Sequence, residues 1–430
     1  MTTNNFISVV TVFLTFLAGL ANGSTIDFDL EIKRLAARPE VSEALRIIET
    51  LDQESDAELI ELTEIPAPPF KEEIRARRYA EKLIDAGMQD TKIDNVGNVI
   101  SRWPGRTGNR TIAIVAHLDT VFPEGTEVTV RQEDGKLYAP GIGDDTRGLV
   151  LLLTMIRAMR SAEVETVDDL LFVATVGEEG LGDLRGVKNL FRQGGPRIDE
   201  LIAIDGGSFK RVLNHAIGSH RYRVTFRGAG GHSWSAFGLA NPAHALARAI
   251  HFFDNEASTF VTTGPRTTYN IGRIGGGTSV NAIPFESWAE IDMRSENPDR
   301  LDEIDAILQS AVQLALVEQN QLLTRGEPLS VTVKSIGNRP SGMIEPETPL
   351  IQRALAATRY FGVIPELAAG STDANVPIAR GIPATTIGRG GQGAGAHSLN
   401  EWWSNTDGYL GVQKALLIAL ASAGVPDRTD

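Results

Sequence analysis

The chain has 430 residues, with 41 basic and 55 acidic side chains, a formal net charge of −14 at pH 7, and no cysteine. The lack of cysteine excludes a disulfide scaffold and any zinc site built on thiolates. The acidic balance argues against a nucleic-acid-binding protein, which would present a basic face. The length exceeds what one small core needs, so we expect two domains.

An apolar run near the N-terminus predicts a targeting segment. Residues 6–21 read FISVVTVFLTFLAGLA, and Ala21-Asn22-Gly23 follows the small-x-small pattern of a signal peptidase site. The run is shorter than the roughly 20 residues that span a bilayer. We therefore interpret residues 1–23 as a cleaved signal peptide of a periplasmic or secreted protein with no later membrane span. The first residues, MTTNN, carry no Lys or Arg, so an uncleaved membrane anchor stays open as the alternative.

The elements that follow predict an α/β fold. A polar helical stretch is expected over residues 28–64, ended by the Pro-rich segment 65–69, and an amphipathic helix over 71–86. Apolar strands are then expected at 111–116, 169–175 and 200–204, with helices at 148–159 and 183–191. Strands that alternate with helices are typical of a central, mostly parallel sheet flanked by helices.

The pattern changes near Gly218 and predicts an inserted domain. Strands are expected at 221–226, 268–274, 287–294 and 329–335, and helices at 242–253 and 298–316. This β-α-β-β-α-β order is the ferredoxin-like split unit. The α/β pattern resumes after Pro340, so residues 218–336 are expected to form an α+β insert within a domain built from residues 24–217 and 337–430.

Five segments place metal-binding side chains at strand ends or in the loops that follow. Ligands of open α/β sheets gather at the carboxyl ends of strands. Each segment alone has an ordinary alternative, such as a core histidine, an exposed loop or a solvated acidic turn before a helix. The segments contain His117 with Asp119, Asp144 with Asp145, Glu178 with Glu179, Asp205, and His397.

Taken together, these side chains predict a centre for two metal ions. Two imidazoles and three carboxylates suit a pair of divalent cations that share one carboxylate. We expect Zn²⁺, with Co²⁺ or Mn²⁺ as alternatives. Two such ions can activate water and polarise an amide carbonyl. Glu178 is then left as the general base. The expected ligands are His117, Asp144, Glu179, Asp205 and His397.

The order of these motifs resembles a known family. HLDTV, GIGDDTRG, GEEG, IDGG and GAHS occur in this order from residue 117 to residue 398. They resemble the co-catalytic zinc exopeptidases and deacylases, a family that includes peptidase T, bacterial glutamate carboxypeptidase, succinyl-diaminopimelate desuccinylase and aminoacylase. The resemblance covers residues from about 60 to about 416.

The resemblance implies a role for each residue of the centre. Asp144 would bridge the two ions, His117 and Asp205 would complete one site, and Glu179 and His397 the other. Glu178 would deprotonate the bridging water and later protonate the leaving amine. Asp119 would buttress His117, and the peptide bond between Asp144 and Asp145 would be cis.

The resemblance extends to the insert and to one later loop. His232, in GAGGHS, would enter the active site of a partner subunit and stabilise the oxyanion, which implies a homodimer formed through the insert. Asn281 would contact substrate from a lid segment, and Arg294 would hold a substrate carboxylate. Gly370 and Ser371 would line the substrate pocket. The alternatives are that His232 is a turn residue and that Arg294 is part of a strand-edge ion pair.

Two features narrow the expected reaction. One branch of amidohydrolases in this family uses a cysteine ligand, and this chain has none. Aminopeptidase-type members tend to carry Asp at the position of Asp205, where acylases and carboxypeptidases carry Glu. We therefore expect a di- or tripeptide aminopeptidase that resembles peptidase T. A glutamate-carboxypeptidase-like enzyme, an N-acyl amino acid deacylase and a non-catalytic binding relative remain as alternatives.

Overall fold

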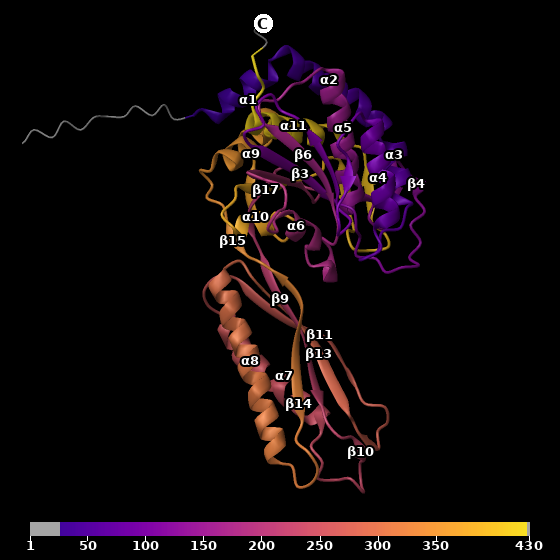
Figure 1. Ribbon diagram of the computed structural model, residues 1–430, viewed down its shortest axis with the longest axis vertical. Coiled ribbons are helices and arrows are strands. Elements are labelled where there is room, and N and C mark those ends of the chain that lie inside the picture. Colours follow the sequence, from indigo (N-terminus) through magenta and orange to yellow (C-terminus); the bar gives the residue numbers. More distant parts are fainter. Residues whose placement is uncertain (1–25, 428–430) are drawn as a thin grey trace, which may run out of the picture.

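The computed structural model describes residues 26–427. The signal peptide expected at residues 1–23 lies outside this part. Figure 1 shows an α/β domain and an elongated insert that extends away from it. Within residues 26–427, no helix is long and apolar enough to cross a membrane.

The α/β domain is built on a nine-stranded sheet. Its strands are β1 (Lys92–Ile93), β2 (Val99–Trp103), β3 (Thr111–His117), β6 (Asp169–Thr175), β7 (Glu200–Ile204), β8 (Arg211–Ala216), β15 (Gly342–Met343), β16 (Glu366–Gly370) and β17 (Ala384–Ile387). Their order is β1-β2-β6-β3-β7-β17-β8-β15, and β16 also pairs with β8. The central strands β6, β3, β7 and β17 are parallel. The prediction of a mostly parallel sheet is therefore confirmed.

The central strands are buried along their length because helices cover the sheet. β6 and β7 have no exposed residue, as their continuous apolar sequences predict for parallel strands. Their side chains share one core with helices α5, α9 and α11. The helices of this domain are α1 (Phe28–Ala36), α2 (Pro39–Glu54), α3 (Asp56–Thr63), α4 (Glu73–Asp85), α5 (Arg147–Ser161), α6 (Arg185–Leu190), α9 (Pro349–Tyr360), α10 (Asn375–Ala379) and α11 (Tyr409–Ala423).

The helical stretch expected over residues 28–64 is divided into three helices. Arg38 has an extended backbone with ψ of 137°, and Pro39 begins α2. Proline disfavours a helical conformation in the residue before it and lacks an N–H for the helix ladder, so the chain bends here. The second break is at Ser55, between α2 and α3.

A small antiparallel sheet lies beside the main one and carries two loops of the candidate site. It consists of β4 (Arg131–Glu133), β5 (Lys136–Tyr138), β18 (Gln392–Ala394) and β19 (Trp402–Ser404), in the order β18-β19-β5-β4. Trp402 pairs with Tyr138 and Trp403 with Leu137. This pairing brings the chain near residue 140 next to the chain near residue 400.

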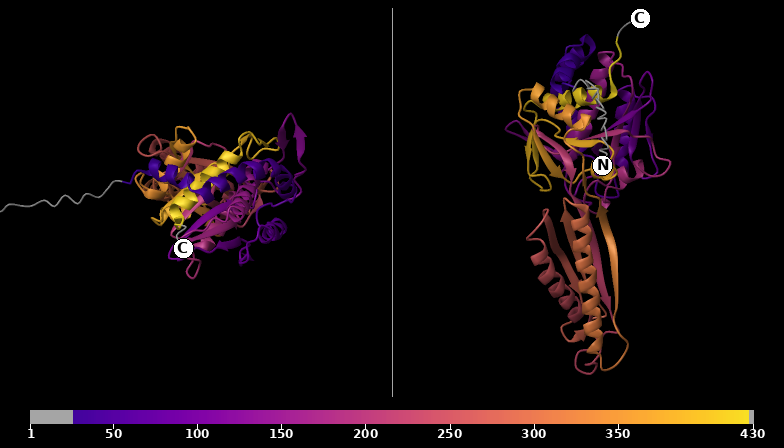
Figure 2. Two further views of the ribbon diagram at one scale, coloured as in Figure 1. Left: turned by 90° about the horizontal axis from the view of Figure 1, so that it is seen from above. Right: turned by 90° about the vertical axis from the view of Figure 1, so that its left-hand side faces the viewer.

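The insert has the split β-α-β-β-α-β topology. Its elements are β9 (Gly218–Arg227), α7 (Pro242–Phe260), β11 (Thr267–Gly276), β13 (Glu286–Ser295), α8 (Pro298–Gln321) and β14 (Ser330–Arg339), with the short strands β10 (Gly231–His232) and β12 (Ala282–Ile283) at one end. The sheet order is β11-β13-β9-β14. The sheet and the two helices enclose a separate apolar core, and Figure 2 shows both helices side by side.

The insert joins the α/β domain through β9 and β14. Arg339 at the end of β14 pairs with Ser219 at the start of β9. The strand therefore continues past residue 336, where the sequence suggested the insert ends. As a result, Arg339 is carried to the border between the insert and the α/β domain.

Candidate metal centre and active site

The parallel register brings the sequence motifs together at one edge of the sheet. His117 pairs with Thr175 at the ends of β3 and β6, and Ile204 pairs with Ile387 at the ends of β7 and β17. The segments that carry Glu178, Glu179 and Asp205 start just beyond these pairs. Because carboxyl ends of parallel strands share one edge, residues far apart in sequence become neighbours.

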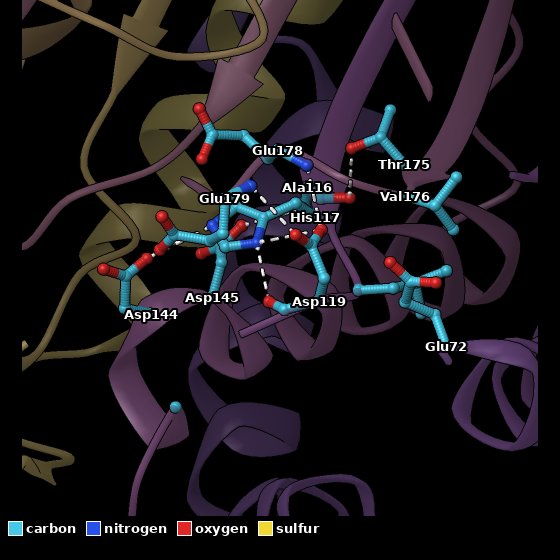
Figure 3. A network of polar contacts seen from close by, with 12 residues as sticks. Glu72, Ala116, His117, Asp119, Asp144, Asp145, Thr175, Val176, Glu178 and Glu179 are labelled. Carbon is cyan, nitrogen blue, oxygen red and sulfur yellow. Dashed lines mark hydrogen bonds and ion pairs between the residues drawn. The ribbon is translucent and has the colours of Figure 1, made fainter. Parts of the chain in front are cut away.

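His117 is oriented by the main chain. Its Nδ1 lies 2.9 Å from the main-chain oxygen of Asp119, and its Nε2 lies 3.2 Å from Oδ1 of Asp144 (Figure 3). A proton on Nδ1 that is donated to this carbonyl leaves the Nε2 lone pair free for a metal ion. The ring itself is buried.

Asp119 acts differently from the sequence expectation. Its carboxylate lies 3.8 Å from Nδ1 of His117, so the short contact to the ring is made by its main-chain oxygen. The carboxylate instead accepts the main-chain N–H groups of Glu178 and Glu179 at 3.0 and 2.8 Å. Asp119 therefore fixes the loop that carries both glutamates.

Asp144 lies between the two histidines. Its Oδ1 is 3.2 Å from Nε2 of His117, and its Oδ2 is 3.2 Å from Nε2 of His397. Each carboxylate oxygen faces a different imidazole, which is the arrangement that a bridging ligand needs. The peptide bond between Asp144 and Asp145 is cis, as expected.

Two ligand sets share Asp144. In the set of His117, Asp144 and Asp205, one ligand atom from each residue lies within 4.8 Å of the others, and the same holds for Asp144, Glu179 and His397. His397 also lies 2.8 Å from Oε1 of Glu179. Imidazole and carboxylate donors in this number fit two divalent cations such as Zn²⁺.

The pKa values of three expected ligands are strongly shifted, as a site for cations predicts. Burial raises the pKa of Asp205 to about 7, and the nearby charge of Asp144 adds to the rise. Burial also acts to raise the pKa of Asp144, but hydrogen bonds from His117 and His397 outweigh it and hold that pKa well below its usual range. Hydrogen bonds to Asp144 and Glu179 raise the pKa of His397 to about 10. Without a cation His397 is therefore protonated at neutral pH, so metal binding has to displace a proton.

Glu178 is buried beside these ligands but faces another partner. Its Oε1 lies 3.0 Å from Nη1 of Arg339, which also donates to Oγ of Ser371 at 3.0 Å. Burial raises the pKa of Glu178 well above its ordinary value, and the charge of Arg339 opposes this rise. A raised pKa suits a carboxylate that takes a proton from water and passes it on.

The centre opens into a cavity of about 370 Å³. This size suits a small ligand. Arg294 lies on its wall, where its Nε binds Oδ2 of Asp292 at 2.7 Å. Gly370 lines a neighbouring cavity of about 190 Å³ that shares Asp205 and Ser371 with the first. The larger cavity is lined by Val121, Asp144, Glu178, Glu179, Gly180, Asp205, Arg221, Arg294, Arg339, Ser371 and His397.

Two of the expected residues lie elsewhere. His232 is in β10 and Asn281 precedes β12, and these short strands pair with each other. Figure 1 shows β10 at the end of the insert that points away from the α/β domain. Both side chains are exposed, so neither belongs to the centre of its own chain.

Sequence reasoning missed four charged residues at the centre. Arg221 and Arg339 line the cavity, Arg389 is buried near Asp144 and Asp205, and Glu401 binds the loop that contains Asp144. Glu401 follows His397 by only four residues, so the sequence could have indicated that it lies near the centre. No local pattern could have indicated the three arginines, because only the folded chain brings them to the carboxylates.

Comparison with known proteins finds the same fold and similar sequences. Aminopeptidase PepT from Bacillus cereus ATCC 10987 has the same fold, with a TM-score of 0.68 at 22% identity over 87% of this chain and 99% of that one. Protein YqjE of Bacillus subtilis (strain 168) is 25% identical over 355 residues, 77% of this chain and 89% of that protein. Carboxypeptidase G2 of Pseudomonas sp. (strain RS-16) is 23% identical over 265 residues, 57% of this chain and 61% of that protein.

The family assignment follows from a match to a described peptidase family over more than half of the chain. Residues 113–420 match the peptidase family M20/M25/M40, and this range contains every expected ligand from His117 to His397. The chain belongs to peptidase family M20/M25/M40, and it is a metal-dependent hydrolase that acts on peptides or related amides.

Proposed function

We propose that this enzyme is an aminopeptidase for di- and tripeptides that resembles peptidase T. The observation that carries the proposal is that Glu178 and Arg294 line the same cavity as four of the five expected ligands, namely Asp144, Glu179, Asp205 and His397. Among described residues, the hydrogen bonds of the Arg294 side chain involve only its Nε, which leaves the terminal nitrogens for a peptide carboxylate. The resemblance associates an Asp at the position of Asp205 with aminopeptidase-type members, which also supports an aminopeptidase.

Different residues of the chain would bind the metal ions, transfer the proton and position the base. His117, Asp144 and Asp205 would hold one cation, and Asp144, Glu179 and His397 the other. Bound divalent ions would supply Lewis acidity, which lowers the pKa of water and polarises the scissile carbonyl. Glu178 takes a proton from the attacking water, the carbon–nitrogen bond breaks, and Glu178 returns that proton to the leaving amine. Arg339 keeps the Glu178 carboxylate in place through the contact at 3.0 Å.

A three-substrate assay tests this proposal. The purified enzyme is incubated with a free-amine tripeptide, an N-acetyl amino acid and an N-blocked dipeptide, each with and without a chelator. Release from the free-amine peptide alone, lost with chelator, supports an aminopeptidase. Cleavage of only the acylated compounds would instead indicate a deacylase or a carboxypeptidase of the glutamate type, and no cleavage in any arm would favour a non-catalytic relative.

The metal content gives an independent test. The enzyme loaded with Zn²⁺, Co²⁺ or Mn²⁺ is expected to hold two ions per chain, because two ligand sets share Asp144. Elemental analysis after removal of loose ions measures the stoichiometry. One ion, or none, would contradict the paired centre.

We also propose that the chain is exported and forms a homodimer through the insert. The exposed side chains of Trp234 and Phe237 beside His232 support an interface there, since they are 86% and 82% exposed in the single chain. Light scattering would measure the mass of the particle, and a monomer would contradict the dimer.

The N-terminal sequence of protein recovered from outside the cytoplasm would test cleavage after Gly23.

A further inference from the structure

The loop between β18 and β19 ends in a buried carboxylate that no step above uses. Glu401 is 1% exposed and directly precedes β19. Its Oε2 accepts the main-chain N–H of Gly141 at 2.8 Å, and its Oε1 accepts those of Gly143 and Asp144 at 2.9 and 2.8 Å. One side chain thus satisfies three main-chain donors around the residue that bridges the two ligand sets.

The backbone of Glu401 also binds the segment that precedes Asp144. Its main-chain oxygen accepts the N–H of Ala139 at 3.1 Å, and the β19–β5 ladder continues this pairing at Trp402 and Tyr138. The segment before Asp144 is therefore fastened to residue 401 from both its backbone and its side chain.

The lack of a side chain at Gly143 allows the Glu401 carboxylate to lie close to the turn. A Cβ atom at Gly143 would lie 3.0 Å from Oε1 of Glu401 and 2.6 Å from Nη2 of Arg389. The first distance is tighter than most real side-chain contacts and the second is a clash, so a side chain at residue 143 would push Glu401 and Arg389 away from the turn. Gly141 has a φ of 77°, which an L side chain disfavours.

The same loop also reaches the side chain of Asp144. His397 lies four residues before Glu401, and its Nε2 is 3.2 Å from Oδ2 of Asp144. Asp144 is thus held at its main-chain N–H by Glu401 and at its carboxylate by His397. The carboxylate oxygen on the other side faces His117 at 3.2 Å.

From these contacts we infer that Glu401 is a positioning residue for the bridging ligand Asp144. Its hydrogen bonds hold the 141–144 turn so that the two oxygens of Asp144 face the two imidazoles before any cation binds. Because Asp144 belongs to both ligand sets, a loose turn weakens both sites. The inference rests on the two-metal centre of the proposed function and adds a residue outside its ligand sets.

Glu401→Gln tests this role with little change in shape. An amide has one acceptor oxygen and one NH₂ donor, so at least one of the three N–H groups loses its acceptor and faces a donor instead. Removal of a partner that orients a ligand typically weakens metal binding about 10- to 100-fold. We expect a loss of this size in the Zn²⁺ affinity of the metal-stripped full chain, measured by competition with a chelator of known affinity.

Asp169→Asn is the matched control. Asp169 is also buried, and its Oδ1 accepts the main-chain N–H of Gly105 at 2.9 Å. It starts β6, whereas Glu178 follows the end of that strand, so it is far from the centre along the sheet. This variant is expected to lower the melting temperature while the Zn²⁺ affinity stays within about twofold of wild type. Comparable losses of affinity in both variants would overturn the positioning role.

The remaining outcomes separate this inference from the proposed function. Wild-type protein that binds two Zn²⁺ ions, together with Glu401→Gln of unchanged affinity, would overturn the inference alone. Wild-type protein that binds no Zn²⁺ would overturn the metal centre and the inference with it. If Glu401→Gln fails to fold, Glu401→Asp takes its place, because its shorter carboxylate cannot reach all three N–H groups. A wild-type affinity in that variant would count equally against the inference.

Discussion

Glu178 and Glu179 are neighbours in the chain but face different partners. Glu179 reaches His397 at 2.8 Å, while Glu178 reaches Arg339 at 3.0 Å. The loop can direct them apart because Asp119 accepts both of their main-chain N–H groups. One glutamate is thus available as a ligand and the other as a base.

Glu178→Gln separates these two roles. The variant keeps every expected ligand, so it should bind two metal ions as the wild type does. It loses the group that moves the proton, which typically contributes about 10²- to 10⁴-fold, so kcat on a free-amine tripeptide should fall by at least this amount. Glu200→Gln is the control, because Glu200 is also buried but starts β7 and pairs with Arg110 at 2.5 Å. An active Glu178→Gln enzyme would disprove the assigned base.

Arg294→Ala tests how the substrate carboxylate is held. A hydrogen-bonded charge pair is worth about 1.5–3 kcal/mol, so KM for a tripeptide should rise roughly 10- to 100-fold with a smaller change in kcat. A tripeptide amide lacks the carboxylate and should be cleaved equally by variant and wild type. Arg248→Ala controls for loss of an arginine from the insert, since Arg248 contacts Gln319 and Glu318 in α8. An equal rise in KM for both substrates would assign Arg294 to another role.

Among the helices, α11 contains a lysine whose side chain is buried in the core. This helix is apolar on nearly all sides and buried along most of its length, and it packs in the core with β3, β6 and β7. Lys414 lies within it with no exposed surface, and its Nζ donates to the main-chain oxygen of Phe209 at 2.6 Å. Burial lowers the pKa of Lys414 to about 7.

This shift predicts a pH-dependent stability. The unfolded chain holds the lysine proton up to a pKa of 10.5, so between pH 7 and 10.5 it binds more protons than the folded chain. Stability therefore rises with pH in this window. Relative to Lys414→Met, the wild type should gain about 2 kcal/mol of unfolding free energy between pH 7 and pH 9. Urea denaturation in the presence of chelator measures the difference, and parallel pH profiles would show that Lys414 is charged in the folded state.

The sequence predicted the main helices and strands of the insert and the strands β3, β6 and β7 of the α/β domain, because their periodicities are strong. No bounds were predicted for the other strands of the main sheet or for α9, α10 and α11. The buried strands at 169–175 and 200–204 have the bounds that their apolar runs indicate. The helical stretch over 28–64 was wrong as one element, since Pro39 interrupts it. The strands β4, β5, β18 and β19 were not predicted, because each has only three residues and depends on its partner for stability.

For the whole molecule, the insert carries His232 away from the centre of its own chain. Two strands, β9 and β14, connect the insert to the α/β domain, and β10 lies at the opposite end (Figure 1). A role for His232 in catalysis therefore requires a second subunit. In a two-fold symmetric dimer every contact between the chains is made twice, so His232 of each chain would reach the site of the other.

Mixing two inactive variants tests this requirement. His232→Ala lacks the proposed oxyanion group, and Glu178→Gln lacks the base, so each homodimer should be inactive or strongly impaired. After the two are unfolded together and refolded, a mixed dimer holds one site with Glu178 from one chain and His232 from the other. Recovered activity, compared with each variant refolded alone, would establish action between subunits. No recovery, with dimers present by light scattering, would contradict it.

The sequence by itself determined the α/β class, the ferredoxin-like insert and the candidate ligand residues, because strand ends and periodic apolar positions are local features of the chain. Only the tertiary structure decided which charges meet. Arg339 reaches Glu178 because β14 extends to the border of the two domains, and Glu401 reaches Asp144 because β19 pairs with β5. Such contacts join residues separated by 161 and 257 positions. Their distances depend on how the folded elements pack, which no local pattern records.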